Sequence, residues 1–213
     1  MTKKLMVGRV AVGGGAPVSI QSMCNTKTDD VDATVAQIRT LADAGCEIIR
    51  VAVPDEAAAM AVDRIKEQIS IPLIADIHFN YKLALMCAER GIDALRINPG
   101  NIGGEEKVRA VAEVCRLKNI PIRIGVNGGS LEKELRARYG GVTAEALVES
   151  AMGHVKLLNR YDFDDICISV KCSDVPLTMR AYTLLSQQTD YPLHLGVTEA
   201  GTPTMGILKS AMG

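Results

Sequence analysis

The chain has 213 residues, and a chain of this length buries roughly 70% of its unfolded surface, which excludes a disulfide-stapled mini-protein. Its 47% hydrophobic and 23% charged residues exclude long-range disorder. The net charge of −1 gives no positive potential to attract nucleic acid, and 3% aromatic residues are too few for base stacking. We therefore expect no nucleic-acid partner.

The sequence contains no signal that directs it to a membrane. No apolar run approaches the roughly 20 residues that cross a bilayer, and the first ten residues lack the apolar stretch of a signal peptide. We therefore expect a cytoplasmic protein with no membrane partner. The cysteines form no C-x-x-C pair and no zinc-type spacing, so we expect free thiols and no metal ligands. They are Cys24, Cys46, Cys87, Cys115, Cys167 and Cys172.

A hairpin opens the predicted order of elements. Residues 5–17 alternate apolar and small side chains around Gly8 and then reach three consecutive glycines, 13–15. Because these glycines precede a strand rather than a helix, we interpret them as a turn and not as a phosphate-binding loop. We expect the hairpin to cover the bottom of the sheet that follows.

Seven short β-branched runs then alternate with amphipathic stretches, which is the pattern of β/α units on a parallel sheet. The predicted strands are 18–23, 48–53, 73–78, 94–98, 122–127, 166–171 and 193–198. The predicted helices lie near 30–44, 55–69, 80–90, 104–118, 143–160 and 176–188. The spacing of about 29 residues per unit is close to that of a (β/α)₈ barrel.

A doubly wound sheet is the competing interpretation. Its dinucleotide-binding versions carry G-x-G-x-x-G in the first β/α turn, and residues 22–30 contain no such motif. The sequence therefore favours an α/β fold of the TIM type, a (β/α)₈ barrel with an N-terminal β-hairpin. Since the seventh unit ends near residue 213, we expect residues 1–213 to form an incomplete barrel, truncated after strand seven.

Polar side chains fall on one face of the predicted strands. Residues two apart on a strand share a face, and the opposite parity is nearly all Val, Ile and Leu, which helices must cover. We therefore expect the polar face to point into the barrel and to form a substrate-binding site near the strand ends. This set comprises Arg50, Asp76, His78, Arg96, Asn98, Arg123, Asn127 and Lys171.

Four members of this set are cations, namely Arg50, Arg96, Arg123 and Lys171. An unpaired buried cation costs several kcal/mol, and the strands supply only Asp76 and the nearby Glu199 as counter-charges. Guanidinium forks match phosphate oxygens, so we expect a phosphorylated ligand, and a diphosphate fits best. The alternative is a structural ion-pair network completed by loop carboxylates such as Glu105 or Asp174.

Other polar residues near the strand ends have individual interpretations. His78 is expected to donate to a phosphate or to act as a general acid. Glu199, at the exit of the seventh strand, is the candidate catalytic acid–base, and the alternative is a partner that holds an Arg or Lys in place. Asn98 and Asn127 are expected to close their strands as neutral donors. His194 is left out as a hydrogen-bonded core residue.

Seven segments at these strand ends carry a family resemblance. They are 18-VSIQSMCNT, 48-IIRVAVP, 75-ADIHFNYKLA, 94-ALRINPGNIG, 123-RIGVNGGSLE, 169-SVKCSD and 196-GVTEAGT. In order and over the whole chain, they resemble the 4-hydroxy-3-methylbut-2-enyl diphosphate synthase family of the non-mevalonate isoprenoid pathway. The resemblance implies an iron–sulfur oxidoreductase that reductively converts 2-C-methyl-D-erythritol 2,4-cyclodiphosphate to 4-hydroxy-3-methylbut-2-enyl diphosphate.

The resemblance also implies roles, a cofactor and partners. The diphosphate-binding residues of the family match Arg50, His78, Arg96, Arg123, Asn127 and Lys171, and its acidic residue near the reacting carbon matches Glu199. A separate C-terminal domain, absent from this chain, would bind a 4Fe-4S cluster through three Cys and one Glu. A homodimer is implied, with flavodoxin or ferredoxin as the electron donor. Without the cluster, we expect residues 1–213 alone to be inactive.

Two other functions stay open on the residues themselves. A pterin-type or phosphosugar barrel enzyme without redox chemistry would use the same ring of cations and no iron. A phosphometabolite-binding module would use the ring without catalysis.

Overall fold

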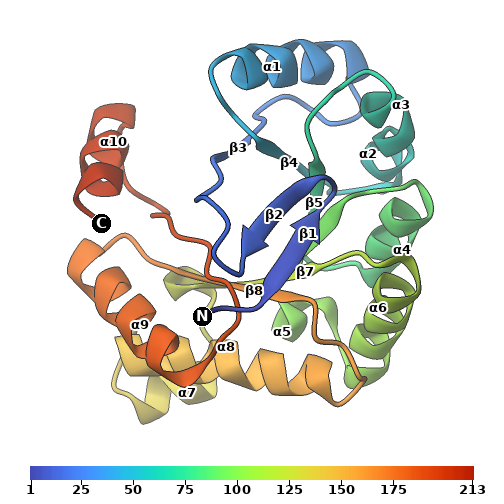
Figure 1. Ribbon diagram of the computed structural model, residues 1–213. Helices are drawn as coiled ribbons and strands as arrows, with labels where there is room; N and C mark the ends of the chain where they lie inside the picture. Colours follow the sequence, from blue (N-terminus) through green and yellow to red (C-terminus); the bar gives the residue numbers. More distant parts are fainter.

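The computed structural model describes residues 1–213, and its centre is one curled parallel sheet (Figure 1). Its strands, in spatial and chain order, are β3 (Gln21–Met23), β4 (Ile48–Ala52), β5 (Leu73–Ile77), β6 (Ala94–Ile97), β7 (Ile122–Asn127) and β8 (Ile166–Lys171). Each strand pairs with the next one in the chain, as successive units of a (β/α)₈ barrel do. The prediction of an incomplete TIM-type barrel with an N-terminal hairpin is confirmed.

Helices cover the outer side of the sheet, close to the predicted spans (Figure 1). The long ones are α1 (Val31–Asp43), α4 (Tyr81–Glu89), α6 (Glu105–Lys118), α8 (Ala144–Asn159) and α9 (Val175–Gln188). All of these except α6 begin at a side chain that accepts a hydrogen bond from a backbone N–H of the first turn. The capping residues are Asp30, Asn80, Thr143 and Asp174.

The predicted helix 55–69 is instead two short helices, α2 (Glu56–Met60) and α3 (Val62–Lys66). Between them the N–H of Ala61 bonds to the carbonyl of Ala58, three residues back, so one tighter turn interrupts the α-helical pattern. Four short elements complete the chain: α5 (Pro99–Ile102), the 3₁₀ turn η1 (Gly128–Ser130), α7 (Lys133–Arg138) and α10 (Pro203–Met212).

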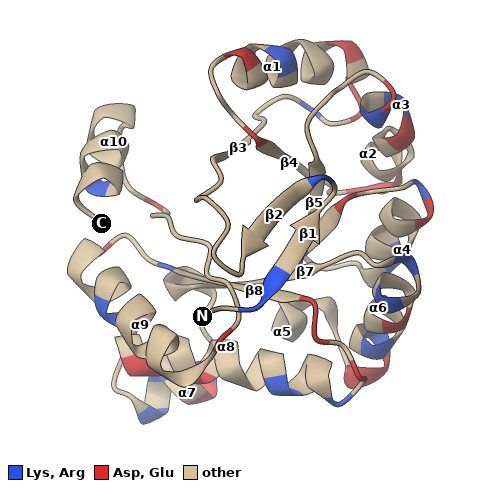
Figure 2. Ribbon diagram, in the orientation of Figure 1, with Lys and Arg blue, Asp and Glu red and all other residues tan.

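The two faces of the sheet differ as the alternation predicts. Side chains such as Ile49, Leu95 and Ile124 are fully buried beneath the helices and belong to the main apolar core. Lys, Arg, Asp and Glu lie mostly on the outer helices and loops (Figure 2). None of the helices combines the length and the hydropathy that spanning a bilayer requires.

The N-terminal hairpin consists of β1 (Lys4–Val7) and β2 (Val10–Gly13), which pair antiparallel. Gly8, at the turn, has φ +54°, and a Cβ atom there would lie 2.9 Å from Asp93 Oδ1, so both conformation and space require glycine. The hairpin packs its apolar side chains on the inner face of the sheet, in a cluster of Leu5, Val7, Ile48, Ile74, Ala94 and Cys167. The expected covering role is confirmed, and this cluster is the apolar floor of the barrel.

The predicted seventh strand, 193–198, is wrong in its extent. Leu193 bridges Ile168, and the N–H of His194 donates to the carbonyl of Ile168 at 2.8 Å, after which the chain leaves the sheet. The physical reason is that no strand of the structure pairs with the other edge of this segment, so its backbone groups have no second ladder to join. The predicted strand 18–23 is shortened to Gln21–Met23 for the same reason at the opposite edge.

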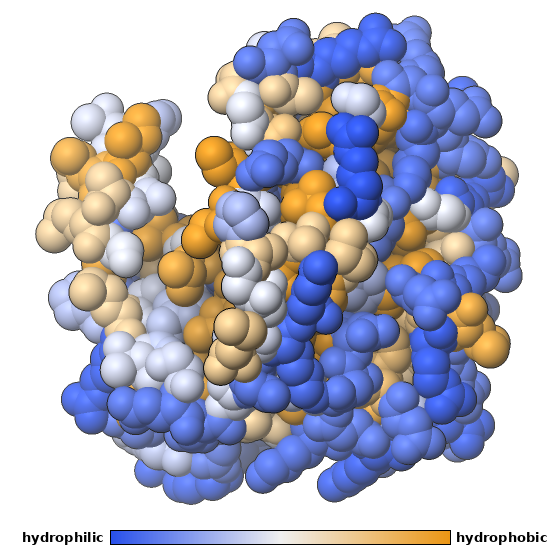
Figure 3. All heavy atoms as spheres, in the orientation of Figure 1, coloured by the Kyte–Doolittle hydropathy of each residue, from blue (hydrophilic) through white to orange (hydrophobic).

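These two edges face each other across an open side of the sheet. Val18, Ile20 and Leu195 are 93%, 61% and 63% exposed there. Apolar atoms gather beside the hollow that separates α10 from the body of the protein (Figure 3). Helix α10 contains no buried residue, and it stands apart from the ring of helices (Figure 1).

Candidate functional site

Asp76 lies at the centre of a charged layer above the apolar floor. It is 2% exposed and shares its carboxylate between two strands. Arg96 Nη1 donates to Asp76 Oδ1 at 2.9 Å, and Arg50 Nε lies 3.5 Å from Oδ2. His78 Nε2, at the top of the same strand, lies 3.9 Å from Oδ1. One carboxylate therefore balances two guanidinium groups, which leaves positive charge in excess.

Arg123 is the most deeply buried cation of the layer and the least well satisfied. It is the register partner of Arg96 on the adjacent strand, and it is 5% exposed. Its Nη1 donates to Gln21 Oε1 at 2.9 Å, whereas its Nε and Nη2 are buried without a hydrogen-bond partner. Burial and, to a lesser extent, the nearby charge of Arg50 lower the pKa of Arg123 to about 10. Two guanidinium nitrogens without an acceptor, in a layer with excess positive charge, are expected where an anion binds and supplies the acceptors.

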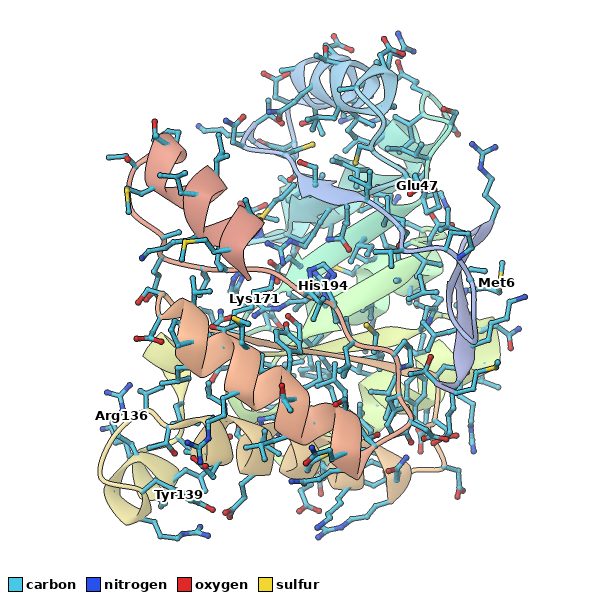
Figure 4. All side chains as sticks on the ribbon, turned by 60° about the vertical axis from the view of Figure 1, so that its left-hand side comes forward. Met6, Glu47, Arg136, Tyr139, Lys171 and His194 are labelled. Carbon is cyan, nitrogen blue, oxygen red and sulfur yellow. The ribbon has the colours of Figure 1, made fainter.

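His194 belongs to this layer, although the sequence analysis left it out. Its Nδ1 lies 2.9 Å from Arg123 Nη1 and its Nε2 lies 3.2 Å from Lys171 Nζ (Figure 4). Burial, with the charges of Arg123 and Lys171, lowers the pKa of His194 to about 2, so the ring is neutral. Because a guanidinium only donates, Nδ1 accepts from Arg123 and the ring proton is placed on Nε2.

Lys171 completes the layer at the end of β8. Burial lowers its pKa to about 7, and the charges of Arg123, Arg50 and Arg96 act in the same direction. The Nε2–H of His194 points at Lys171 Nζ, and a neutral amine accepts that hydrogen bond. Without an anion, Lys171 is therefore close to losing its proton at neutral pH.

The rim of the layer carries the remaining predicted residues. His78 has half of its side chain exposed at the end of β5. Asn98 is buried, and its Oδ1 accepts the Gly100 N–H at 3.0 Å, so this amide caps α5. Asn127 is partly buried where β7 enters η1.

Glu199 is exposed, with φ +52°, and its carboxylate lies against the turn after β7. A Cβ atom built on Gly129 would be 2.9 Å from Glu199 Oε1, which shows how closely the carboxylate approaches this turn. No Lys, Arg or His lies within 4.0 Å of the Glu199 carboxylate. The alternative in which Glu199 holds a cation in place therefore has no support in the structure.

The loop carboxylates named as alternative counter-charges lie elsewhere. Glu105 pairs with Arg160 at 3.2 Å on the surface. Asp174 accepts the Leu177 N–H at 2.7 Å at the start of α9. Neither neutralises the inner cations, so the ion-pair network proposed as an alternative is not formed by these residues.

The cysteines are buried free thiols, as predicted. Burial raises the pKa of Cys24 to about 11 and that of Cys87 and Cys115 to about 12, so these side chains stay protonated. No three His, Cys, Asp or Glu side chains of the chain converge as metal ligands do. The residues present therefore do not fit a 4Fe-4S cluster.

Comparison with known proteins agrees with this geometry. The family described as the GcpE TIM-barrel domain matches residues 2–213. A relative from Geobacter sulfurreducens, named 4-hydroxy-3-methylbut-2-en-1-yl diphosphate synthase (flavodoxin), is 61% identical over 212 residues. One of the same name from Ectopseudomonas mendocina is 59% identical over 213 residues. The alignments cover all of this chain but 60% and 58% of those relatives, so the chain spans about three fifths of their length.

Solved structures confirm the fold alone. A 3-dehydroquinate dehydratase from Geobacillus kaustophilus superposes with a TM-score of 0.70 at 13% identity, covering 98% of this chain and 83% of that one. A dihydropteroate synthase from Yersinia pestis gives 0.67 at 11% identity, covering 100% and 86%. The identity of the chain follows from the family match and from the two relatives above: it belongs to the GcpE TIM-barrel domain family.

Proposed function

We propose that the chain is the substrate-binding barrel of a 4-hydroxy-3-methylbut-2-enyl diphosphate synthase, which opens the ring of 2-C-methyl-D-erythritol 2,4-cyclodiphosphate reductively. The observation that carries this proposal is the charge of the inner layer, where four cations face one carboxylate and Arg123 keeps two buried nitrogens unpartnered. The name of the relatives specifies a diphosphate synthase and agrees with that chemistry.

The cations have distinct tasks in binding the diphosphate. Arg96 and Arg123 present forked donors from neighbouring strands, and Asp76 orients Arg96 and Arg50 without cancelling their charge. Lys171 adds a positive charge when the anion binds, because the anion raises the pKa of the amine and so keeps it protonated. The anion thus supplies the hydrogen-bond acceptors that these buried donors lack.

The rim residues surround the part of the substrate that reacts. His78 is positioned to donate to a phosphate oxygen, and Asn127 with the turn after β7 adds neutral donors. Glu199 lies against that turn and holds or moves a proton at the reacting carbon. Asn98 contributes through the α5 cap that it makes rather than as a free donor.

Ring opening consumes two electrons, and this chain's residues do not fit the group that supplies them. We place a 4Fe-4S cluster in the part of the protein that corresponds to the remaining two fifths of the relatives' length. Flavodoxin, which the relatives' name gives, is the electron donor that we propose. A homodimer in the cytoplasm remains part of the same proposal.

The test uses the full-length protein, purified without oxygen and supplied with reduced flavodoxin and the cyclic diphosphate. Phosphorus NMR is expected to show conversion to the linear diphosphate that stops when flavodoxin is omitted. Binding of the cyclic diphosphate without turnover would point to the phosphometabolite-binding module. Turnover without reductant would point to the barrel enzyme without redox chemistry, and absence of binding would overturn the assignment of the inner layer.

A further inference from the structure

A second polar cluster, partly buried, lies outside the charged layer. Glu132, two residues after η1, has its Oε1 3.1 Å from His154 Nε2 and accepts a hydrogen bond from Ser150 Oγ at 2.9 Å. His154 and Ser150 are one turn apart on α8 and are 8% and 4% exposed. The Glu132 side chain is 33% exposed, but its Oε2 and His154 Nε2 are buried without a hydrogen-bond partner. Burying such polar atoms is costly, so their placement calls for a role.

The imidazole of His154 touches two loops at once. Besides Glu132 after β7, it meets the loop after β6, because a Cβ atom built on Gly100 would lie 3.2 Å from His154 Cε1. The adjacent His154 imidazole, together with the Ser150 hydroxyl, lowers the pKa of the Glu132 carboxyl group to about 2, so the carboxylate is ionised at neutral pH. Helix α8 therefore contacts, through His154 and Ser150, both loops that leave the middle of the sheet.

The two loops carry the rim of the anion site. The turn after β7 contains Gly129, against which the Glu199 carboxylate lies. Arg136 of α7 supports the same turn, because its Nη2 donates to the Gly128 carbonyl at 2.9 Å. Glu132 thus follows closely on the turn against which the Glu199 carboxylate lies.

We propose that Glu132, His154 and Ser150 form a positioning unit that fixes the loops after β6 and β7 and, through Gly129, holds Glu199 in register with the bound substrate. None of the three touches the charged layer, so they are positioning residues and not catalytic ones. The inference rests on the proposed function for what Glu199 acts upon. The part of the inference that concerns the loops rests only on contacts within this chain.

Glu132→Ala in the full-length protein tests the unit, with Glu149→Ala as the matched control. Glu149 also ties α7 to α8, through Arg138 and Tyr139 at 2.6 Å each, but it contacts neither rim loop. We expect Glu132→Ala to speed amide hydrogen exchange of residues 127–130 by about tenfold or more, since a local contact that closes the loop is lost. The control is expected to leave that exchange unchanged.

The kinetic arm separates positioning from plain stability. We expect Glu132→Ala to lower kcat by roughly 10–100-fold, the usual cost of a misplaced reacting group, while affinity for inorganic pyrophosphate changes by less than about threefold. Unchanged loop exchange, or a lower melting temperature with unchanged kcat, would overturn the inference. Should Glu132→Ala fail to fold, Glu132→Gln keeps the shape of the side chain and its acceptor for Ser150, and it is expected to give the same changes in weaker form.

Failure of the proposed function has a different signature. If the unaltered protein neither binds pyrophosphate nor reduces the cyclic diphosphate, the assignment of the inner layer fails. The exchange of residues 127–130 then still decides whether Glu132, His154 and Ser150 fix the loop.

Discussion

The guanidinium of Arg96 lies against the backbone of Gly125 on the neighbouring strand, and its Nη2 donates to the Gly125 carbonyl oxygen at 3.4 Å. A Cβ atom built on Gly125 would lie 2.6 Å from Nη2 and 2.8 Å from Cζ of Arg96. The absence of a side chain at position 125 is therefore what allows the arginine to occupy the inner layer.

Gly125→Ala should displace Arg96 without removing any charge. We expect affinity for inorganic pyrophosphate, measured by calorimetry on the full-length protein, to fall by about tenfold or more, since hydrogen bonds to charged groups contribute about 1.5–3 kcal/mol. Gly153→Ala is the control, because its Cβ would meet nothing within 4 Å. Equal affinity in the two variants would show that Arg96 does not need the space at Gly125.

Arg96→Ala removes the forked donor itself. We expect binding of the same anion to weaken by about 1.5–3 kcal/mol. Arg116→Ala serves as the control, because Arg116 is half exposed and lies 3.8 Å from Asp162 on the surface. Unchanged affinity after Arg96→Ala would remove this residue from the site.

The protonation of Lys171 should make anion binding depend on pH. Its pKa of about 7 in the free protein lies below the ordinary 10.5, and an anion favours the charged amine. Above pH 7, binding therefore takes up a proton, and affinity should fall by up to about tenfold per pH unit as pH rises. Calorimetry in buffers of different ionisation enthalpy measures that uptake at pH 8.

Lys171→Arg provides the comparison, because a guanidinium keeps its charge over this range. The anion's own titration is the same for both proteins, so only the difference between the two profiles reports on Lys171. Parallel profiles for the two proteins would mean that Lys171 is already charged in the free site.

Glu199→Gln separates binding from chemistry. The amide keeps the size of the side chain and its hydrogen bonding but cannot transfer a proton, so turnover should fall by roughly 10²–10⁴. Affinity should change little or improve, because a negative charge near the diphosphate is removed. The measurement is single-turnover conversion at saturating substrate. Weakened binding with near-normal turnover would assign Glu199 a structural role instead.

Much of the inner layer could be predicted because strand parity is a local property. The alternation of each strand placed Arg50, Asp76, Arg96 and Arg123 on the inner face. The structure brings all four together there, with Arg50 partly exposed and the other three buried. The cap at Asn98 could also have been predicted, since Asn followed by Pro is typical of a helix start. We had instead interpreted Asn98 as a free donor.

Relationships between distant residues could not be predicted in this way. His194 contacts Arg123 and Lys171, which come from two other segments of the chain, only because the fold buries all three side chains side by side. Glu132 and His154 meet because the loop after β7 folds back on α8, and no periodicity carries that information. The seventh strand failed because pairing depends on neighbours at both edges and not on the apolar pattern of the segment itself.

The register that places Arg96 opposite Arg123 has a consequence for the life of the protein in the cell. Two like charges brought together by strand pairing oppose the final assembly of the sheet. An anion that binds only the folded barrel offsets this, adding about 2.7 kcal/mol of stability at 100 times its dissociation constant. On the proposed function, the diphosphate is thereby expected to stabilise the folded barrel, so its supply should slow proteolysis of newly made chains.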